Sequence, residues 1–548
     1  MSPSPTPSQD IQTFHILGCG FGPANLGIAV AILDKQASEQ VKHIPRTVFV
    51  EKHAEFQWHP GMLLPGSRMQ ISCLKDLATL RNPSSPFTFL SYLHSQNRLS
   101  AFINRGSTIP TRREFADYLA WAAREVERRG VGIAYSEEVI AISKIFLDVQ
   151  ELIEVTSRQV HTEHIILSAG GSPRLPRVLS SLVPSQWSPE TSPSVPVLHT
   201  ASYMTSIRPL LAQLGGTNRP LKIAFVGGGQ SSAECVLDMH HRLGALHSKG
   251  HQIDMIIRKG SLKPSDDSPF VNEIFDPKIT DDWYNLHSDR LRGNIMSEYK
   301  NTNYSVVNSV TLDILYELVY NQKLSYDIAM RDASNDALPN VRVSIRTYET
   351  VIGAASAPPS ESNSSSKRIA LTRQHSLTHK LLEDTYDAVI CGTGYDRTAW
   401  LRLLRSSNIA NDFGLVRAVE DVPIKLVPAH YAVEPEEEDA PASFNLKDDH
   451  DAATETDHSS TGSLSTPSTP PSSPSLSLSL NVFPAASTTQ LRISRAYRLL
   501  PTTEGSRSRV YLQGCAEATH GLSDTLLSVI GVRAGEVVDD LWAISDSD

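Results

Sequence analysis

Apolar residues in the first third of the chain follow two spacings, one typical of buried strands and one typical of helices. The runs FHILG from Phe14, TVFVE from Thr47 and HIILSAG from His164 have the length and composition of buried strands. Between them, TRREFADYLAWAAREVERRG from Thr111 places apolar residues at helical spacing, with a capping box at its start and a glycine at its end. This alternation predicts a doubly wound α/β domain.

Two later stretches of the chain also join a predicted strand to a glycine-containing turn. LKIAFVGGGQSSAECVLDMHHRL begins at Leu221 and predicts a strand, a turn and a helix, while YDAVICGTGYD, from Tyr386, predicts a third strand and turn. Two stretches break the pattern, SAPPSESNSSSKR from Ser356 and an acidic, then Ser/Thr/Pro-rich run from Glu434 to Ser479. Neither carries enough apolar surface to offset its ordering entropy, so both are predicted to be flexible inserts.

Length, charge and cysteine content narrow the class of protein. A chain of 548 residues is too long for one hydrophobic core, so at least two domains are expected. The net charge of -10, without a basic stripe, argues against nucleic-acid binding. Five scattered cysteines, no secretory signal and no apolar run of membrane-spanning length predict reduced thiols in a cytoplasmic protein without a membrane partner.

The first glycine-rich turn, in HILGCGFGPANLG, joins an apolar strand to a helix. Gly18, Gly20 and Gly22, followed by Pro23, allow the backbone to approach a pyrophosphate at the helix N-terminus. Glu51, at the end of the next strand, is placed to accept hydrogen bonds from an adenosine ribose. Because proline replaces the third glycine of the usual fingerprint, the motif taken alone also fits a tight turn without a ligand.

A second turn, VGGGQSSAE, repeats this arrangement in the middle of the chain. Its candidate cofactor-binding residues are Gly227, Gly229, Gln230 and Ser231. The next strand ends in Arg258 rather than in an acid, which favours the 2′-phosphate of NADPH over NADH. Judged in isolation, Arg258 and Lys259 also fit an exposed surface turn.

Two nucleotide turns on one chain suggest a flavin, FAD, together with NADPH, and the third turn, with Gly394, returns the chain toward them. The CxxC pair of a disulfide reductase and the FxGxxxHxxxWP signature of a ketone monooxygenase are both missing. The predicted fold is α/β, with two Rossmann-like dinucleotide-binding domains and a smaller substrate-binding region. In chain order, the predicted segments are a disordered N-terminus (1–12), the first part of an FAD-binding domain (13–215), an NADPH-binding domain with a flexible insert near 356–368 (216–380), a return to the FAD and substrate region (381–433), a low-complexity insert (434–490) and the C-terminal part of the FAD and substrate domain (491–548).

Four blocks of sequence carry a family resemblance. FQWHPGMLLPGSRMQISCLKDLATLRNPSSPFTFLSYL, SDDSPFVNEIFDP, NTNYSVV and ATHGLSDTLLSV closely resemble the L-ornithine N5-monooxygenases of siderophore biosynthesis. The resemblance implies a class B flavin monooxygenase in which NADPH reduces FAD and O2 then forms a C4a-hydroperoxyflavin. Transfer of its distal oxygen to the side-chain amine of L-ornithine gives N5-hydroxyornithine, the first step toward a hydroxamate siderophore. Members of this family are commonly homotetramers.

The same resemblance assigns roles to single residues. Lys75 matches the lysine that pairs with the substrate carboxylate, and Asn272, Asn303 and Ser523 match polar residues that hold the amino acid. The residues that it places next to the flavin or the nicotinamide are Met69, Gln70 and Tyr304.

Other interpretations of these residues stay open from the sequence. Lys75 also fits an ion pair with Asp76, and the asparagines fit turns with side-chain-to-backbone hydrogen bonds. No residue is assigned as an acid or base, because the adjacent carboxylates of Asp266 and Asp267 are typical of a solvated loop. No metal site is predicted, since the candidate histidines, His59 and His520, are isolated in the sequence.

Two alternative functions also remain. A lysine N6-hydroxylase differs by one methylene of substrate, which a pocket discriminates by only about 1–3 kcal/mol. A catalytically silent flavoprotein would act as an interaction scaffold through its acidic and Ser/Pro-rich insert. The intact glycine turns, together with Lys75, Asn272 and Asn303, favour an active enzyme.

Overall fold

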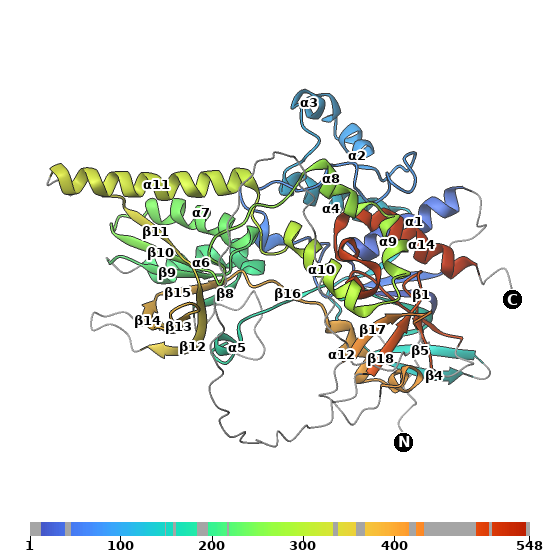
Figure 1. The fold of residues 1–548 in the computed structure, drawn as a ribbon. Coiled ribbons are helices and arrows are strands. Elements are labelled where there is room, and N and C mark those ends of the chain that lie inside the picture. The colour runs from blue at the N-terminus through green and yellow to red at the C-terminus, as the bar shows by residue number, and fades with distance from the viewer. Residues whose placement is uncertain are drawn as a thin grey trace, which may run out of the picture.

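The chain forms two lobes joined by short crossing segments (Figure 1). The computed structural model describes residues 12–38, 45–147, 150–156, 160–183, 196–215, 219–332, 338–357, 368–415, 424–431, 489–502 and 507–543. The predicted disordered N-terminus and both predicted inserts lie almost entirely outside these ranges.

Within the described residues, the first lobe is built on a seven-stranded sheet. The strand order is β3 (Gly132–Ala134), β2 (Thr47–Val50), β1 (Thr13–Cys19), β6 (Val160–Leu167), β5 (Gln150–Thr156) and β4 (Ala141–Leu147), with β20 (Arg509–Leu512) also paired to β6. β1 runs parallel to β2 and β6, with Gly18 opposite Phe49 and Ile166. The predicted strands FHILG, TVFVE and HIILSAG are therefore neighbours in one sheet.

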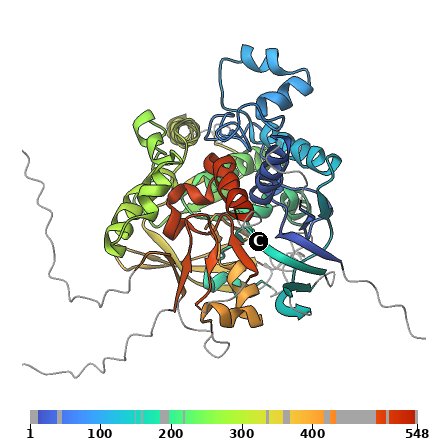
Figure 2. The same ribbon diagram turned by 90° about the vertical axis from the view of Figure 1, so that its right-hand side faces the viewer.

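Helices from both ends of the chain lie together on this lobe. α1 (Pro23–Ala37) contacts both α4 (Arg112–Arg128) and α14 (Ile530–Trp542), and Figure 2 shows the blue N-terminal and red C-terminal helices side by side. The start of α4 is confirmed, because the hydroxyl of Thr111 accepts from the N–H of Glu114 at 3.1 Å. The Glu114 carboxylate instead pairs with Arg98 and Arg105.

The second lobe has a parallel sheet of five strands among the residues described. Its order is β11 (Val341–Arg346), β10 (His251–Ile256), β9 (Lys222–Val226), β15 (Ala388–Cys391) and β8 (Val197–His199). The main helices of this lobe are α6 (Tyr203–Gly215), α7 (Gln230–Gly244) and α11 (Ser309–Asp332), the last of which is the long helix at the upper left of Figure 1. An antiparallel sheet is added by β12 (Glu349–Ala357), β13 (Arg368–His375) and β14 (Leu381–Tyr386).

The chain crosses between the lobes at β7 (Ser172–Pro173) and β16 (Tyr395–Asp396), which pair antiparallel. This arrangement differs from the predicted division at 215/216 and 380/381. β8 and β15 pair with each other in the second-lobe sheet, although both lie in segments that were predicted to belong to the FAD region. β8 is only three residues long, too short to display a strand period.

A smaller region connects the second-lobe chain to the C-terminal segment. α9 (Ile279–Tyr284) contacts α13 (Glu517–His520), and Tyr284 Oη donates to the carbonyl of Ile493 at 2.8 Å. The other elements here are α8 (Pro269–Asn272), α10 (Asp289–Asn303), β17 (Ile424–Pro428), β18 (Thr489–Ile493) and β19 (Leu499–Leu500). The remaining helices are α2 (Phe89–Ser95), α3 (Leu99–Asn104), α5 (Arg177–Ser180) and α12 (Ala399–Arg405), with short 3-10 turns that include Pro60–Met62 and Leu522–Thr525.

Across the described ranges, no helix is both long enough and apolar enough to cross a bilayer.

Candidate active site

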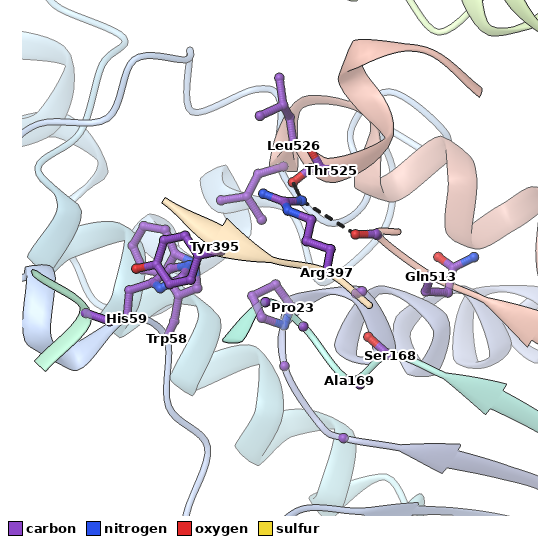
Figure 3. A pocket seen from close by; sticks show the side chains of 18 of the residues that line it. Pro23, Trp58, His59, Ser168, Ala169, Tyr395, Arg397, Gln513, Thr525 and Leu526 are labelled. Carbon is purple, nitrogen blue, oxygen red and sulfur yellow. Dashed lines mark hydrogen bonds between the residues drawn. The ribbon is translucent and has the colours of Figure 1, made fainter. Parts of the chain in front are cut away.

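A cavity of about 1780 Å³ is lined by residues of both lobes (Figure 3). Of the residues predicted from the sequence, those that line it are Gly20, Gly22, Pro23, Glu51, Met69, Gln70, Lys75, Asn272 and Asn303. Those that do not line it are Gly18, Gly227, Gly229, Gln230, Ser231, Arg258, Tyr304, Gly394 and Ser523. The structure therefore brings most of the predicted FAD and substrate residues together and places the second glycine turn apart from them.

The first glycine turn fits a pyrophosphate. Gly20 has φ +83°, and a Cβ there would lie 2.7 Å from the carbonyl oxygen of Ser168. A Cβ on Gly22 would meet nothing within 4 Å, so this residue opens onto free space. Gly22 is the N-cap of α1 and supplies no side-chain cap, which leaves the first-turn N–H groups available to an anion. Gly18 has a packing role instead, because its Cβ would lie 2.2 Å from the ring of Phe49.

Glu51, which was predicted to accept hydrogen bonds from an adenosine ribose, is held in place by the first glycine turn. Its carboxylate accepts from the N–H of Phe21 at 2.7 Å and from the N–H of His53 at 3.0 Å. A carboxylate has about four acceptor positions, so capacity for ribose hydroxyls remains on a residue that lines the cavity.

The second glycine turn also has the backbone of a nucleotide site. Gly227 has φ +127°, and a Cβ there would lie 2.3 Å from the carbonyl oxygen of Gly392, in the turn after β15. Gly229 caps α7 without a side-chain hydrogen bond, as Gly22 caps α1. Arg258 is exposed and makes no ion pair with the described residues, which leaves its guanidinium available to a phosphate.

Gln230 ties together two elements of the second lobe. Its Oε1 accepts from the N–H of Asn308 at 2.6 Å, and its Nε2 donates to Glu234 at 2.7 Å. Glu234 in turn forms a two-contact ion pair, at 2.6 and 3.0 Å, with Arg112 of the first lobe. The carboxamide predicted to contact a cofactor is thus engaged by protein groups and joins α7 to the start of α11.

Lys75 lies half-buried in the cavity wall and has no ion pair with any described carboxylate. The alternative pairing with Asp76 does not occur. Asp76 is buried and accepts instead from the backbone N–H groups of Ala78 at 2.9 Å and Phe89 at 2.6 Å. The Lys75 ammonium is therefore an uncommitted positive charge at the cavity.

The two asparagines differ in their surroundings. The Oδ1 atom of Asn303 is buried without a hydrogen-bond partner among the described residues, although the residue lines the cavity. Because a buried acceptor without a donor is costly, this atom is available to a donor group of a molecule bound in the cavity. Asn272 is exposed and donates to the carbonyl of Asp267 at 3.1 Å, the turn-forming contact that the sequence also allowed.

The C-terminal segment contributes polar residues that the sequence analysis missed. Within the described ranges, four more side-chain atoms are buried without hydrogen-bond partners on residues that line the cavity: Gln513 Oε1, Thr525 Oγ1, Ser528 Oγ and Arg533 Nε. Ser523, which was predicted, is buried and does not line it, because the short turn Leu522–Thr525 presents Thr525 instead. No motif distinguishes these common residue types before the turn geometry is known.

Arg397 and two histidines surround the crossing strand β16. In Figure 3, Arg397 points toward the C-terminal segment and donates to the carbonyls of Thr525 at 3.3 Å and Gly514 at 3.5 Å. Desolvation, with Arg112 and Arg397 nearby, lowers the pKa of His59 to about 4. His59 is therefore a neutral imidazole at pH 7 and a weak base.

His199 holds the third glycine turn. Its Nδ1 accepts from the N–H of Ala201, so its Nε2 carries the proton and donates to the carbonyl of Gly394 at 3.0 Å. Burial lowers the pKa of His199 to about 4. Gly394 has φ +80° and directly precedes the crossing strand β16, so the hydrogen bond from His199 holds the turn at the interlobe crossing.

In the described part of the chain, no group of three or more His, Cys, Asp or Glu side chains is arranged to hold a metal ion.

Comparison with known proteins agrees with this geometry. The profile of the L-lysine 6-monooxygenase/L-ornithine 5-monooxygenase family matches residues 12–397. An L-ornithine N(5)-monooxygenase of Ceriporiopsis subvermispora is 46% identical over 96% of this chain and 98% of its own. The ornithine hydroxylase of Pseudomonas aeruginosa has a TM-score of 0.69 at 30% identity, covering 97% of this chain and 99% of its own.

A second solved structure is an ornithine N-hydroxylase of Kutzneria sp. 744 with reduced FAD, NADP+ and L-ornithine. It has a TM-score of 0.67 at 26% identity, covering 97% of this chain and 100% of its own. The match in sequence and in fold extends over almost the whole chain. The protein therefore belongs to the L-lysine 6-monooxygenase/L-ornithine 5-monooxygenase family.

Proposed function

We propose that this protein hydroxylates the side-chain amine of L-ornithine, using FAD, NADPH and O2, to give N5-hydroxyornithine. The observation that carries the proposal is the uncommitted ammonium of Lys75 in the same cavity as the first glycine turn. Near-full-length curated relatives that are 46% and 42% identical are named L-ornithine N(5)-monooxygenases, which supports ornithine as the substrate.

The two cofactors would occupy the two glycine turns. Gly20 and Gly22 fit the FAD pyrophosphate, with Glu51 at its ribose, while Gly227 and Arg258 fit NADPH. When bound and reduced, the flavin supplies activated oxygen for transfer to the amine. The protein's part is to place the amine, to exclude water and to keep the amine neutral.

Substrate orientation follows from the charges in the cavity. The Lys75 ammonium pairs with the substrate carboxylate, and the free Oδ1 of Asn303 accepts from its α-ammonium group. Binding ornithine by its α-substituents leaves the side-chain amine at the far end of the molecule, free to approach the flavin.

The amine must lose a proton before it can act as a nucleophile. An alkylammonium has a pKa of about 10.4, so deprotonation at pH 7 costs roughly 4.6 kcal/mol. His59, with a pKa of about 4, is too weak a base to hold this proton. Desolvation in the cavity favours the neutral amine and meets part of the cost, and the proton leaves to solvent.

The test is to measure NADPH oxidation and hydroxylamine product together, with ornithine, with lysine and with no amino acid. The proposal predicts product from ornithine in near-stoichiometric ratio to NADPH. Product from lysine alone would instead support the second candidate, lysine N6-hydroxylation, which the family description includes. NADPH oxidation without hydroxylated product would contradict both.

We further infer the biological setting of the reaction. Hydroxyornithine is the precursor of a hydroxamate iron ligand, which makes this the first step of siderophore biosynthesis. All five cysteines are free thiols, which supports a cytoplasmic location. A homotetramer is proposed from the family resemblance.

A further inference from the structure

The last turn of α10 carries Asn303 into the cavity, and one carboxylate outside that helix binds this turn twice. Glu517, on α13, accepts from the hydroxyl of Tyr304 at 2.6 Å. Its other oxygen lies 3.3 Å from the ammonium of Lys300. Lys300 and Tyr304 flank Asn303 in the chain, and the Lys300 ammonium also lies 5.7 Å from the centre of the Tyr304 ring.

We propose that Glu517 is a positioning residue for the substrate, which holds the end of α10 so that Asn303 presents its carboxamide to the amino acid. The inference rests on the proposed function. α10 ends at Asn303, and Tyr304 closes it by donating its N–H to the carbonyl of Lys300. A helix end frays unless it is capped or tied to another element, and Glu517 supplies that tie.

The surroundings of Glu517 strengthen its contacts with Lys300 and Tyr304. The Glu517 side chain is only 19% exposed, so solvent screens its two contacts less than it would on an open surface. Burial and the neighbouring carboxylate raise the pKa of Tyr304 to about 12, which keeps its hydroxyl protonated as a donor. The Oδ1 of Asn303 has no hydrogen-bond partner in the part of the chain that the structure describes, so its position depends on the backbone that Glu517 holds.

Glu517→Ala tests the proposal through the split between KM and kcat. We expect the KM for ornithine to rise about tenfold, the cost of reordering roughly one residue on each binding event. The value of kcat at saturating ornithine and the rate of flavin reduction by NADPH should stay within about twofold of wild type, because neither Glu517 nor its partner Tyr304 lines the cavity. Glu517→Gln keeps an acceptor for Tyr304 and should recover part of the affinity, and it carries the test if the alanine variant fails to fold.

A double-mutant cycle with Asn303→Ala gives the sharper outcome. If Glu517 acts through Asn303, adding Glu517→Ala to Asn303→Ala raises KM no further. Equal effects of Glu517→Ala in both backgrounds, or a wild-type KM in the single variant, would overturn the proposal. Glu298→Ala, at an exposed position of the same helix with no ion pair to the described residues, is the matched control. A wild-type enzyme that makes no hydroxyornithine would refute the proposed function itself, which is a separate result.

Discussion

Glycines of the first turn meet different physical requirements, although the sequence presents them as one motif. Position 18 requires glycine because a Cβ would overlap the ring of Phe49, and position 20 requires it because of its positive φ. Neither reason applies to Gly22. The open space at Gly22 is therefore a property of the ligand site rather than of the fold.

Paired alanine substitutions separate these roles. Gly18→Ala should destabilise the protein by about 1–3 kcal/mol, because its Cβ overlaps a buried ring. Gly22→Ala, at φ -79°, should leave the stability of the flavin-free protein within about 0.5 kcal/mol but weaken FAD binding. Urea unfolding and flavin content after purification measure the two effects. Equal flavin retention in Gly22→Ala and wild type would contradict the pyrophosphate assignment.

Lys75→Ala removes the only charge that we assign to the substrate carboxylate. The KM for ornithine should rise between about tenfold and a hundredfold, in line with the loss of a charge-assisted hydrogen bond. Flavin reduction by NADPH should be nearly unchanged, since the second glycine turn, which we propose binds NADPH, does not line the cavity that holds Lys75. Steady-state and stopped-flow kinetics distinguish the two steps, and an unaltered KM would exclude the assigned role.

His199 makes stability depend on pH. Its pKa is about 4 in the folded protein and near 6.5 in the unfolded chain, so the unfolded chain binds more protons between these values. The stabilising contribution is complete above pH 6.5 and is lost as the pH falls toward 4. From pH 7 to 5 the wild type should lose roughly 2 kcal/mol more than His199→Gln in urea unfolding. Equal losses in the two proteins would show that His199 does not carry the effect.

Among the secondary-structure elements, α4 of the first lobe and α7 of the second lobe are joined by an ion pair. Arg112 begins α4 and Glu234 lies in the first turns of α7, directly after the second glycine turn. Their ion pair therefore ties the second glycine turn, which we propose binds NADPH, to the first lobe.

Glu234→Gln should slow flavin reduction by NADPH roughly tenfold, since small misplacements of reacting groups are costly, and should change the KM for ornithine less. Asp238→Asn is the control, because Asp238 lies one turn further along α7 and pairs with Arg242 within the same helix. Stopped-flow reduction under anaerobic conditions measures the rate. Equal slowing in both variants would indicate a general loss of α7 stability.

At the scale of the whole molecule, local patterns predicted more than long-range arrangement. The sequence predicts the strand runs, the start of α4 and the first two glycine turns, because each of these features depends on residues that are neighbours in the chain. The short strand β8 lies in a segment that was predicted to belong to the FAD-binding domain, because only its pairing with β15 places it in the second-lobe sheet. Thr525 and Ser528 were missed for a related reason, since their burial beside the cavity depends on contacts with distant segments.

In the proposed reaction, one oxygen atom from O2 is transferred to the side-chain nitrogen of ornithine. The direct measurement is mass spectrometry of the product formed under 18O2, with NADPH and L-ornithine supplied to the flavin-loaded enzyme. We expect N5-hydroxyornithine that carries a single 18O atom. Product that takes its oxygen from water, or 18O that appears only in hydrogen peroxide, would rule out this oxygen transfer.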